Sequence, residues 1–126
     1  MPTQDLLIDT DVIIDYLRGR HEALTYLDNL TNSLFMSVIT VGELYAGVRD
    51  GDERVKLDTF LRAFVIITLD QTTALAGGLL RRDYGKSHGI GLADALIAAK
   101  AHQHNLRLVS LNRKHFSMIQ DVIVPY

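Results

Sequence analysis

The chain has 126 residues, of which 48% are hydrophobic and 22% are charged, and its formal net charge is −2. This length and composition predict one globular domain, residues 1–126, and exclude a disordered chain. The net charge argues against a uniformly basic nucleic-acid binder, although it leaves room for a local basic patch. The sequence has no cysteine, which excludes disulfides and thiolate chemistry. No apolar run reaches the length of about 18 residues that a membrane span needs, so we expect a cytoplasmic protein.

Short β-type runs alternate with helical patterns along the chain. Strands are expected at residues 6–8, 34–37, 65–68, 106–110 and 122–124. Helices are expected from about residue 11 to 18 and at residues 22–30, 40–49, 53–64, 70–84 and 91–104. This alternation predicts an α/β fold in which helices cover both faces of a central parallel sheet of four to five strands. In such sheets, binding sites form beyond the carboxyl ends of the strands.

Three acidic residues lie in strongly apolar segments. Asp9 follows LLI, Glu43 lies within SVITVGELYAGV, and Asp94 lies within IGLADALIAAKA. A carboxylate among such neighbours is unfavourable unless it is paired, hydrogen-bonded or bound to a metal. Each acid also has a local explanation. Asp9 or Asp11 could cap the first helix, Glu43 could pair with Thr40 in a capping box, and the third acid could complement a helix dipole.

The positions of these acids in the predicted fold favour a shared site. Each acid lies where a strand has just ended or a helix has just begun, and Asn112 follows the strand LRLVS. Three carboxylates that meet at one sheet edge would repel one another without a cation. Oxygen ligands suit Mg²⁺ or Mn²⁺. A zinc site at His102 and His104 is the alternative, but residues two apart do not share a helix face, and no histidine is in obvious register with the acids for general-base work.

Four segments resemble PIN domains, in the small bacterial toxin form called VapC. LLIDTDVIIDYLRG resembles the family's opening strand and first acid, SVITVGELYAGV the segment of the second acid, and GLADALIAA that of the third. LRLVSLNRKHF resembles the closing motif, in which Ser110 precedes an acidic or amide position, here Asn112. DTD alone is common, but four motifs in this order, over nearly the whole chain, are specific. The resemblance implies a three-layer α/β/α PIN-like fold.

The same resemblance implies the toxin of a toxin–antitoxin pair, a metal-dependent endoribonuclease. It would hydrolyse phosphodiester bonds of RNA, such as tRNA or rRNA, with metal-activated water. A cognate VapB-like antitoxin would neutralise it by docking in a groove beside the first helices and inserting a basic side chain among the acids. The family also implies a homodimer, with the helices around residues 43–49 and 72–82 as the candidate interface. Packing against the sheet explains the small residues of segment 74–80 equally well.

The resemblance also implies roles for the acidic positions. Asp9 and Asp94 are the expected direct ligands of Mg²⁺ or Mn²⁺, and Glu43 is a ligand or orients water at the metal. Asn112, expected to hydrogen-bond such a water, stands where many members have Asp, so any second metal would be weakly held. Asp11 stands where Asn is frequent in the family. It either replaces part of the charge missing at position 112 or only caps the first helix.

Three further residues of the closing segment are candidates for the site. Ser110 would bond a neighbouring carboxylate or merely end its strand. Arg113 and Lys114 directly follow the amide position and could contact RNA phosphate. Their alternative role is to complete the polar first turn of a short helix.

Three other functions compete with this interpretation. A receiver-like signalling module could use Asp70 as phosphoacceptor, but it leaves Asp94 unexplained. A haloacid-dehalogenase phosphatase could use DTD, but the chain is short and the required late acidic pair is missing. A catalytically silent PIN-like binding domain is the third alternative, because Asn112 reduces the charge of the site.

Overall fold

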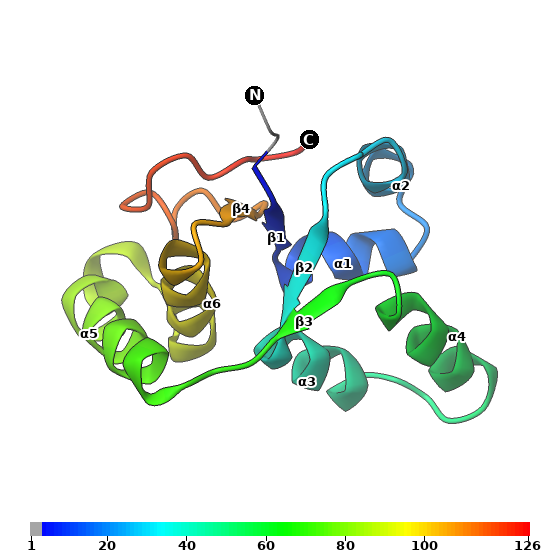
Figure 1. The fold of residues 1–126 in the computed structure, drawn as a ribbon, viewed down its shortest axis with the longest axis horizontal. Helices are drawn as coiled ribbons and strands as arrows, with labels where there is room; N and C mark the ends of the chain where they lie inside the picture. Colours follow the sequence, from blue (N-terminus) through cyan, green and yellow to red (C-terminus); the bar gives the residue numbers. More distant parts are fainter. Residues whose placement is uncertain (1–3) are drawn as a thin grey trace.

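The computed structural model describes residues 4–126 and contains a parallel sheet with helices on both faces (Figure 1). The strand order is β3-β2-β1-β4, and each neighbouring pair is parallel. The strands are β1 (Leu6–Ile8), β2 (Leu34–Ser37), β3 (Val65–Ile67) and β4 (Arg107–Val109). The predicted α/β fold with a central parallel sheet is therefore confirmed. In this part of the chain, no helix is long and apolar enough to span a bilayer.

Within residues 4–126, six helices flank this sheet. They are α1 (Thr10–Leu17), α2 (His21–Asp28), α3 (Val38–Ala46), α4 (Asp52–Leu61), α5 (Gln71–His88) and α6 (Leu92–Gln103). Helices α1 to α4 lie on one side of the sheet, while α5 and α6 pack together on the other (Figure 1). Because every strand is parallel, the carboxyl ends of all four strands lie at one edge, which is where sites form in such sheets.

The central strand β1 contributes side chains to both hydrophobic cores. All three of its side chains are buried, as expected for a strand covered by helices on both faces. Leu6 and Ile8 join the core under α1 to α4, whereas Leu7 joins the core under α5 and α6. This alternation follows from the period of two in a strand. It fixes the end of β1, and therefore Asp9, rigidly between the two layers.

The structure corrects two local predictions. Ser37, not Thr40, caps α3: its hydroxyl accepts from the backbone N–H of Ile39 at 3.1 Å. Helix α3 thus begins directly after β2, with no connecting loop, which releases Thr40 and Glu43 from the predicted capping box. The expected strand at residues 122–124 is reduced to one isolated parallel bridge between Val109 and Ile123.

Candidate active site

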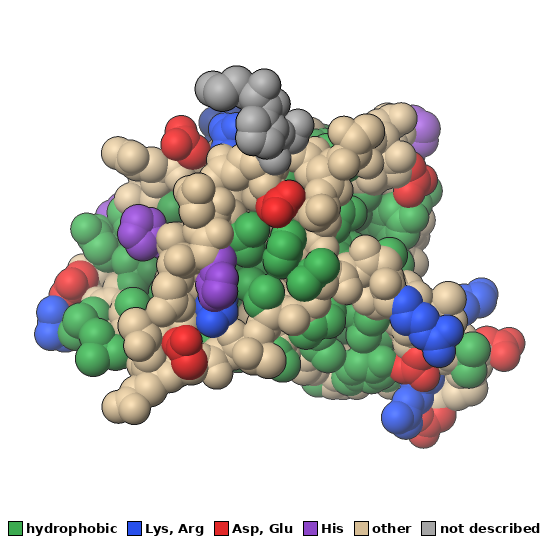
Figure 2. All heavy atoms as spheres, in the orientation of Figure 1, with side chains coloured by type: hydrophobic (Ala, Val, Ile, Leu, Met, Phe, Trp, Pro, Cys, Tyr) green, Lys and Arg blue, Asp and Glu red, His purple; other side chains and the backbone are tan. Residues whose placement is uncertain are grey.

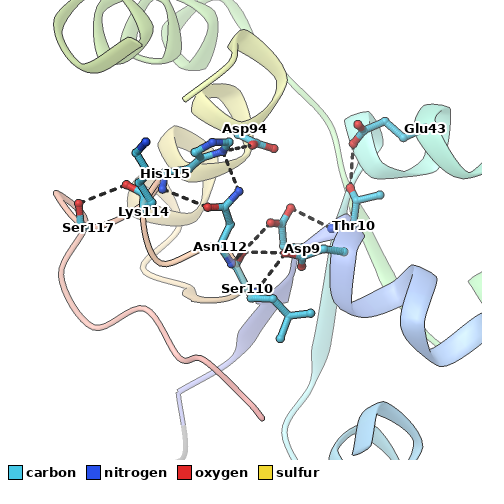
Figure 3. Close-up of polar contacts among 11 residues, drawn as sticks. Asp9, Thr10, Glu43, Asp94, Ser110, Asn112, Lys114, His115 and Ser117 are labelled. Atoms are coloured by element: carbon cyan, nitrogen blue, oxygen red, sulfur yellow. Dashed lines mark hydrogen bonds and ion pairs between the residues drawn. The ribbon is translucent and has the colours of Figure 1, made fainter. Parts of the chain in front are cut away.

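The predicted acids come together beyond the carboxyl ends of β1 and β4 (Figure 3). Asp9 directly follows β1 and is the N-cap of α1. Asp94 lies in the first turn of α6, and Glu43 lies on α3. Ser110 and Asn112 follow β4 and lie beside Asp9 and Asp94 (Figure 3). Segments far apart in the sequence therefore place their polar side chains at one edge of the sheet.

Asp9 is the buried centre of this cluster, with 4% of its surface exposed. Its Oδ1 accepts from the backbone N–H of Thr10 at 2.8 Å, and its Oδ2 accepts from Ser110 Oγ at 2.8 Å. Burial, followed by the nearby charge of Asp11, raises the pKa of Asp9 to about 7, although the bond from Ser110 opposes this rise. The charge of Asp94 contributes in the same direction. The ionised form of Asp9 is thus unfavourable until positive charge arrives.

Asp11 is not the cap of α1 but a link between α1 and the segment after β4. Its Oδ1 accepts from the N–H of Val12 at 2.7 Å, and its Oδ2 accepts from the N–H of Leu111 at 3.1 Å. The hydroxyl of Ser110 lies 3.3 Å from the same oxygen. Burial raises the pKa of Asp11, against the effect of these bonds. Asp11 therefore adds negative charge beside Asp9.

Glu43 reaches the site through two threonine hydroxyls. Thr10 Oγ1 donates to Glu43 Oε1 at 2.8 Å, and Thr40 Oγ1 lies 2.9 Å from Thr10 Oγ1. Because the Thr10 proton is used by the carboxylate, the buried Thr40 hydroxyl is the donor to Thr10. Glu43 itself is exposed. This hydroxyl pair joins α3 to the start of α1 and orients Glu43 at the rim of the site.

Asp94 is joined to Asn112 through a residue that the sequence motifs did not indicate. His115 Nδ1 lies 3.2 Å from Asp94 Oδ2 and 2.8 Å from Asn112 Nδ2 (Figure 3). His115 is therefore a neighbour of both predicted residues, whereas the absence of a histidine in register for general-base work stays a prediction. The available signal was the spacing Asn112-x-x-His115 in the turn after β4, where the asparagine oxygen accepts from the N–H three residues on.

The other candidates lie farther from the cluster centre. Arg113 and Lys114 are exposed on the turn after Asn112, where they can meet a ligand approaching from solvent. They do not begin a helix, because residues 113–118 form turns. His102 and His104 lie at the carboxyl-terminal end of α6, whereas Asp94 lies at its amino-terminal end. The two histidines are thus separated from the acids by the length of the helix.

The negative charge and the oxygen atoms of the site suit a divalent cation, although the side chains do not form a complete set of ligands around one point. Among residues 4–126, no three acidic or histidine side chains already surround a single point closely enough to hold an ion. Asp9 nevertheless has a raised pKa to which Asp11 and Asp94 both contribute. A cation between these carboxylates would remove that unfavourable crowding. All the donors are oxygen atoms, which suits Mg²⁺ or Mn²⁺.

Comparisons with known proteins agree with this geometry. The PIN domain family model matches residues 6–121. Ribonuclease VapC19 of Mycobacterium tuberculosis is 39% identical over 124 residues, which cover 95% of this chain and 98% of that protein. Toxin FitB of Neisseria gonorrhoeae is 32% identical over 126 residues, covering 88% of this chain and 90% of that toxin.

Solved structures give the same result. A toxin–antitoxin complex from Klebsiella pneumoniae matches with a TM-score of 0.85 and 32% identity, over 97% of this chain and 98% of that one. VapBC2 from Rickettsia felis, bound to a DNA fragment from its promoter, matches with a TM-score of 0.76 and 28% identity, over 94% of this chain and 95% of that one. The predicted resemblance is confirmed: this chain belongs to the PIN-domain family and, within it, to the VapC proteins.

Proposed function

We propose that this protein is the toxin of a toxin–antitoxin pair, an endoribonuclease that hydrolyses RNA phosphodiester bonds and is neutralised by a VapB-like antitoxin. Similarity to proteins named as VapC ribonucleases and to toxin–antitoxin complexes supports this function. We place its activity in the cytoplasm, where structured RNA such as tRNA and rRNA is available.

The position of the acids is the observation that best supports metal-dependent catalysis. Acids from three separate segments meet at the carboxyl edge of the sheet, and short polar bridges hold each of them. Ser110 holds Asp9, and Thr10 holds Glu43. His115 holds Asp94. Burial raises the pKa of Asp9 to about 7 despite the hydrogen bonds that it accepts, so the arrangement suits a ligand that brings positive charge.

In the proposed mechanism, Asp9 and Asp94 bind Mg²⁺ or Mn²⁺, with Glu43 at the rim as a further ligand or as an acceptor for water. Such a cation would supply a Lewis acid that activates water and offsets charge on the phosphate. Asn112 stays neutral and can hydrogen-bond water or a phosphate oxygen. Asp11 supplies the charge that Asn112 lacks, because its carboxylate lies in the same cluster.

RNA must approach a site with excess negative charge. Arg113 and Lys114 are exposed on the turn that carries Asn112, so they can contact phosphates beside the acids. Phosphate contacts of this kind weaken as salt rises, because counterions compete for the backbone. We therefore expect cleavage to need a divalent cation and to fall with added salt.

A groove next to the site provides a location for the antitoxin. It has a volume of about 640 Å³ and is lined by α1, α3 and α4. Glu43 lines this groove and also accepts from Thr10, so the groove meets the rim of the site at Glu43. Apolar side chains lie beside charged ones over α3 and α4 (Figure 2). An antitoxin segment with an apolar face and a basic side chain would fit both features.

The experiment is RNA cleavage by the purified chain, freed of antitoxin, with Mg²⁺, with Mn²⁺ or with EDTA. We expect cleavage with either metal and none in EDTA. Asp94→Asn should lower the cleavage rate at least about a hundredfold, because it removes a proposed ligand of the cation. A hundredfold loss corresponds to about 3 kcal/mol of transition-state stabilisation, at ~1.4 kcal/mol for each factor of ten. The matched control is Asp83→Asn, on the exposed surface of α5, which should cleave like the unmodified protein.

The same assay separates the proposal from its main rival. A catalytically silent PIN-like binding domain would cleave no RNA at any metal concentration while still binding its partner. If Asp94→Asn retains full cleavage, the protein is a nuclease but the assignment of Asp94 is wrong. Urea unfolding without metal should show that Asp94→Asn is as stable as the unmodified chain or slightly more stable, because the substitution removes a charge from a crowded cluster.

A further inference from the structure

We propose that His115 is a positioning residue, which holds Asp94 and Asn112 through its Nδ1 atom and thereby sets the affinity of the site for a divalent cation. The inference rests on the proposed function, in which Asp94 binds that cation. The observation behind it is that one ring nitrogen lies within hydrogen-bond distance of both candidate residues.

The backbone around His115 is held on both sides. Its N–H donates to Asn112 Oδ1 at 3.2 Å, and the N–H of Phe116 donates to the Asn112 carbonyl at 3.4 Å. Phe116 is 1% exposed and belongs to the core under α5 and α6. The turn is therefore anchored in that core, and the imidazole points back toward α6 rather than into solvent (Figure 3).

The ring is also confined at its far nitrogen. A Cβ atom added to Gly89 would lie 3.3 Å from His115 Nε2, so the imidazole lies against the connection between α5 and α6. Gly89 caps α5 with a φ of 71°, in the left-handed region that glycine adopts most easily. The ring thus rests between this connection and Asp94, and Nδ1 is the nitrogen that faces the acids.

The two partners make incompatible demands on Nδ1. The Asn112 amide has its oxygen directed to the His115 N–H, so its Nδ2 is a donor and needs a lone pair on Nδ1. The Asp94 carboxylate instead needs a proton on Nδ1. A neutral imidazole satisfies one partner at a time. With its proton on Nδ1, the ring donates to Asp94 Oδ2 and leaves the other carboxylate oxygen for a cation. With a lone pair on Nδ1, it accepts from the Asn112 amide instead, so His115 supports one of the two residues in either tautomer.

This role predicts a pattern of substitutions that packing alone would not produce. An asparagine at position 115 places its amide near the Nδ1 position and can donate or accept there. A glutamine places its amide near the Nε2 position, farther from Asp94. Groups that orient a metal ligand typically change affinity by about 10–100-fold when lost. We expect that loss in His115→Ala and His115→Gln, and an affinity within about threefold of the unmodified protein in His115→Asn.

The test is Mn²⁺ binding to the RNA-free protein, followed by the electron paramagnetic resonance signal of free Mn²⁺. Urea unfolding in EDTA verifies that each variant is folded. If His115→Ala does not fold, the comparison of Mn²⁺ affinity between His115→Asn and His115→Gln decides the test. Equal Mn²⁺ affinity in all four proteins, or a His115→Gln that binds as tightly as His115→Asn, would overturn the role of His115 alone. An unmodified protein that binds no Mn²⁺ would overturn the cation site of the proposed function as well.

Discussion

Replacing Asp9 with asparagine should stabilise the metal-free protein, although it removes a central site residue. The folded-state pKa of Asp9 is about 7 and its ordinary value is 3.8, mainly because the side chain is buried. Because the folded-state pKa is above the unfolded value, Asp9 contributes most favourably to the free energy of unfolding below about pH 4, and this contribution is lost as the pH rises toward 7. At about 1.4 kcal/mol for each pKa unit, the ionised carboxylate costs the folded state about 4 kcal/mol at pH 8.

Asparagine keeps most of the local bonds. Its oxygen can still accept from the N–H of Thr10, since asparagine is a good N-cap. Its amide can donate to Ser110 Oγ, which then reverses its hydroxyl, at a cost of about 1 kcal/mol for the poorer bond. Asp9→Asn should therefore raise the free energy of unfolding by about 2–3 kcal/mol at pH 8, and this gain should vanish between about pH 4 and pH 5.

The assay is urea unfolding in EDTA at pH 5, 6, 7 and 8, with the difference between Asp9→Asn and the unmodified protein taken at each pH. Other carboxylates titrate in both proteins, so the difference isolates position 9. Asp83→Asn is the control and should show no trend, because Asp83 is exposed. Mn²⁺ should stabilise the unmodified protein more than Asp9→Asn. If Asp9→Asn is less stable at pH 8, or if the difference does not change with pH, the electrostatic account of Asp9 is refuted.

Two further predictions concern partners. Leu17→Glu places a charge in the groove beside α1, where Leu17 is 43% exposed. This variant should abolish pull-down of a co-expressed antitoxin and leave RNA cleavage intact. The control is Val55→Glu, at an exposed position of α4 outside the groove, which should change neither property. For the predicted homodimer, Leu75→Glu changes an exposed side chain on α5 and should yield a monomer in light scattering after gel filtration; a dimer of unchanged mass would exclude this helix from the interface.

The sequence predicts the sheet well because parallel strands have a strong signature. The apolar run of β1 and the small-residue helix α6 identify buried elements directly. The segment at residues 74–80 shows the limit of such patterns. Gly77 packs so tightly on Leu96 that an added Cβ would lie 2.7 Å from its Cδ2. Packing within the subunit thus explains Gly77, while nothing lies within 4 Å of a Cβ at Gly78.

Errors in the predicted site come from contacts between distant segments. Two hydroxyl residues near the start of α3, Ser37 and Thr40, could cap this helix, and local propensity does not distinguish them. Only the position of Thr10, delivered by β1, shows that Thr40 belongs to the hydroxyl pair at Glu43. His115 was missed for the same reason, because it meets Asp94 across 21 residues of sequence.

The two open alternatives for Asp11 and Ser110 depend on one atom. Ser110 Oγ is buried, donates to Asp9 Oδ2, lies 3.3 Å from Asp11 Oδ2, and accepts from the N–H of Asn112 at 3.1 Å. Ser110 therefore does more than end its strand, because the orientation of both carboxylates and of the turn depends on the same hydroxyl. Asp11 cannot be understood as a helix cap either, since its Oδ2 bonds the segment after β4. One oxygen of each acid accepts from the N–H of the next residue in the chain, and the second oxygen is positioned by the chain that returns from β4.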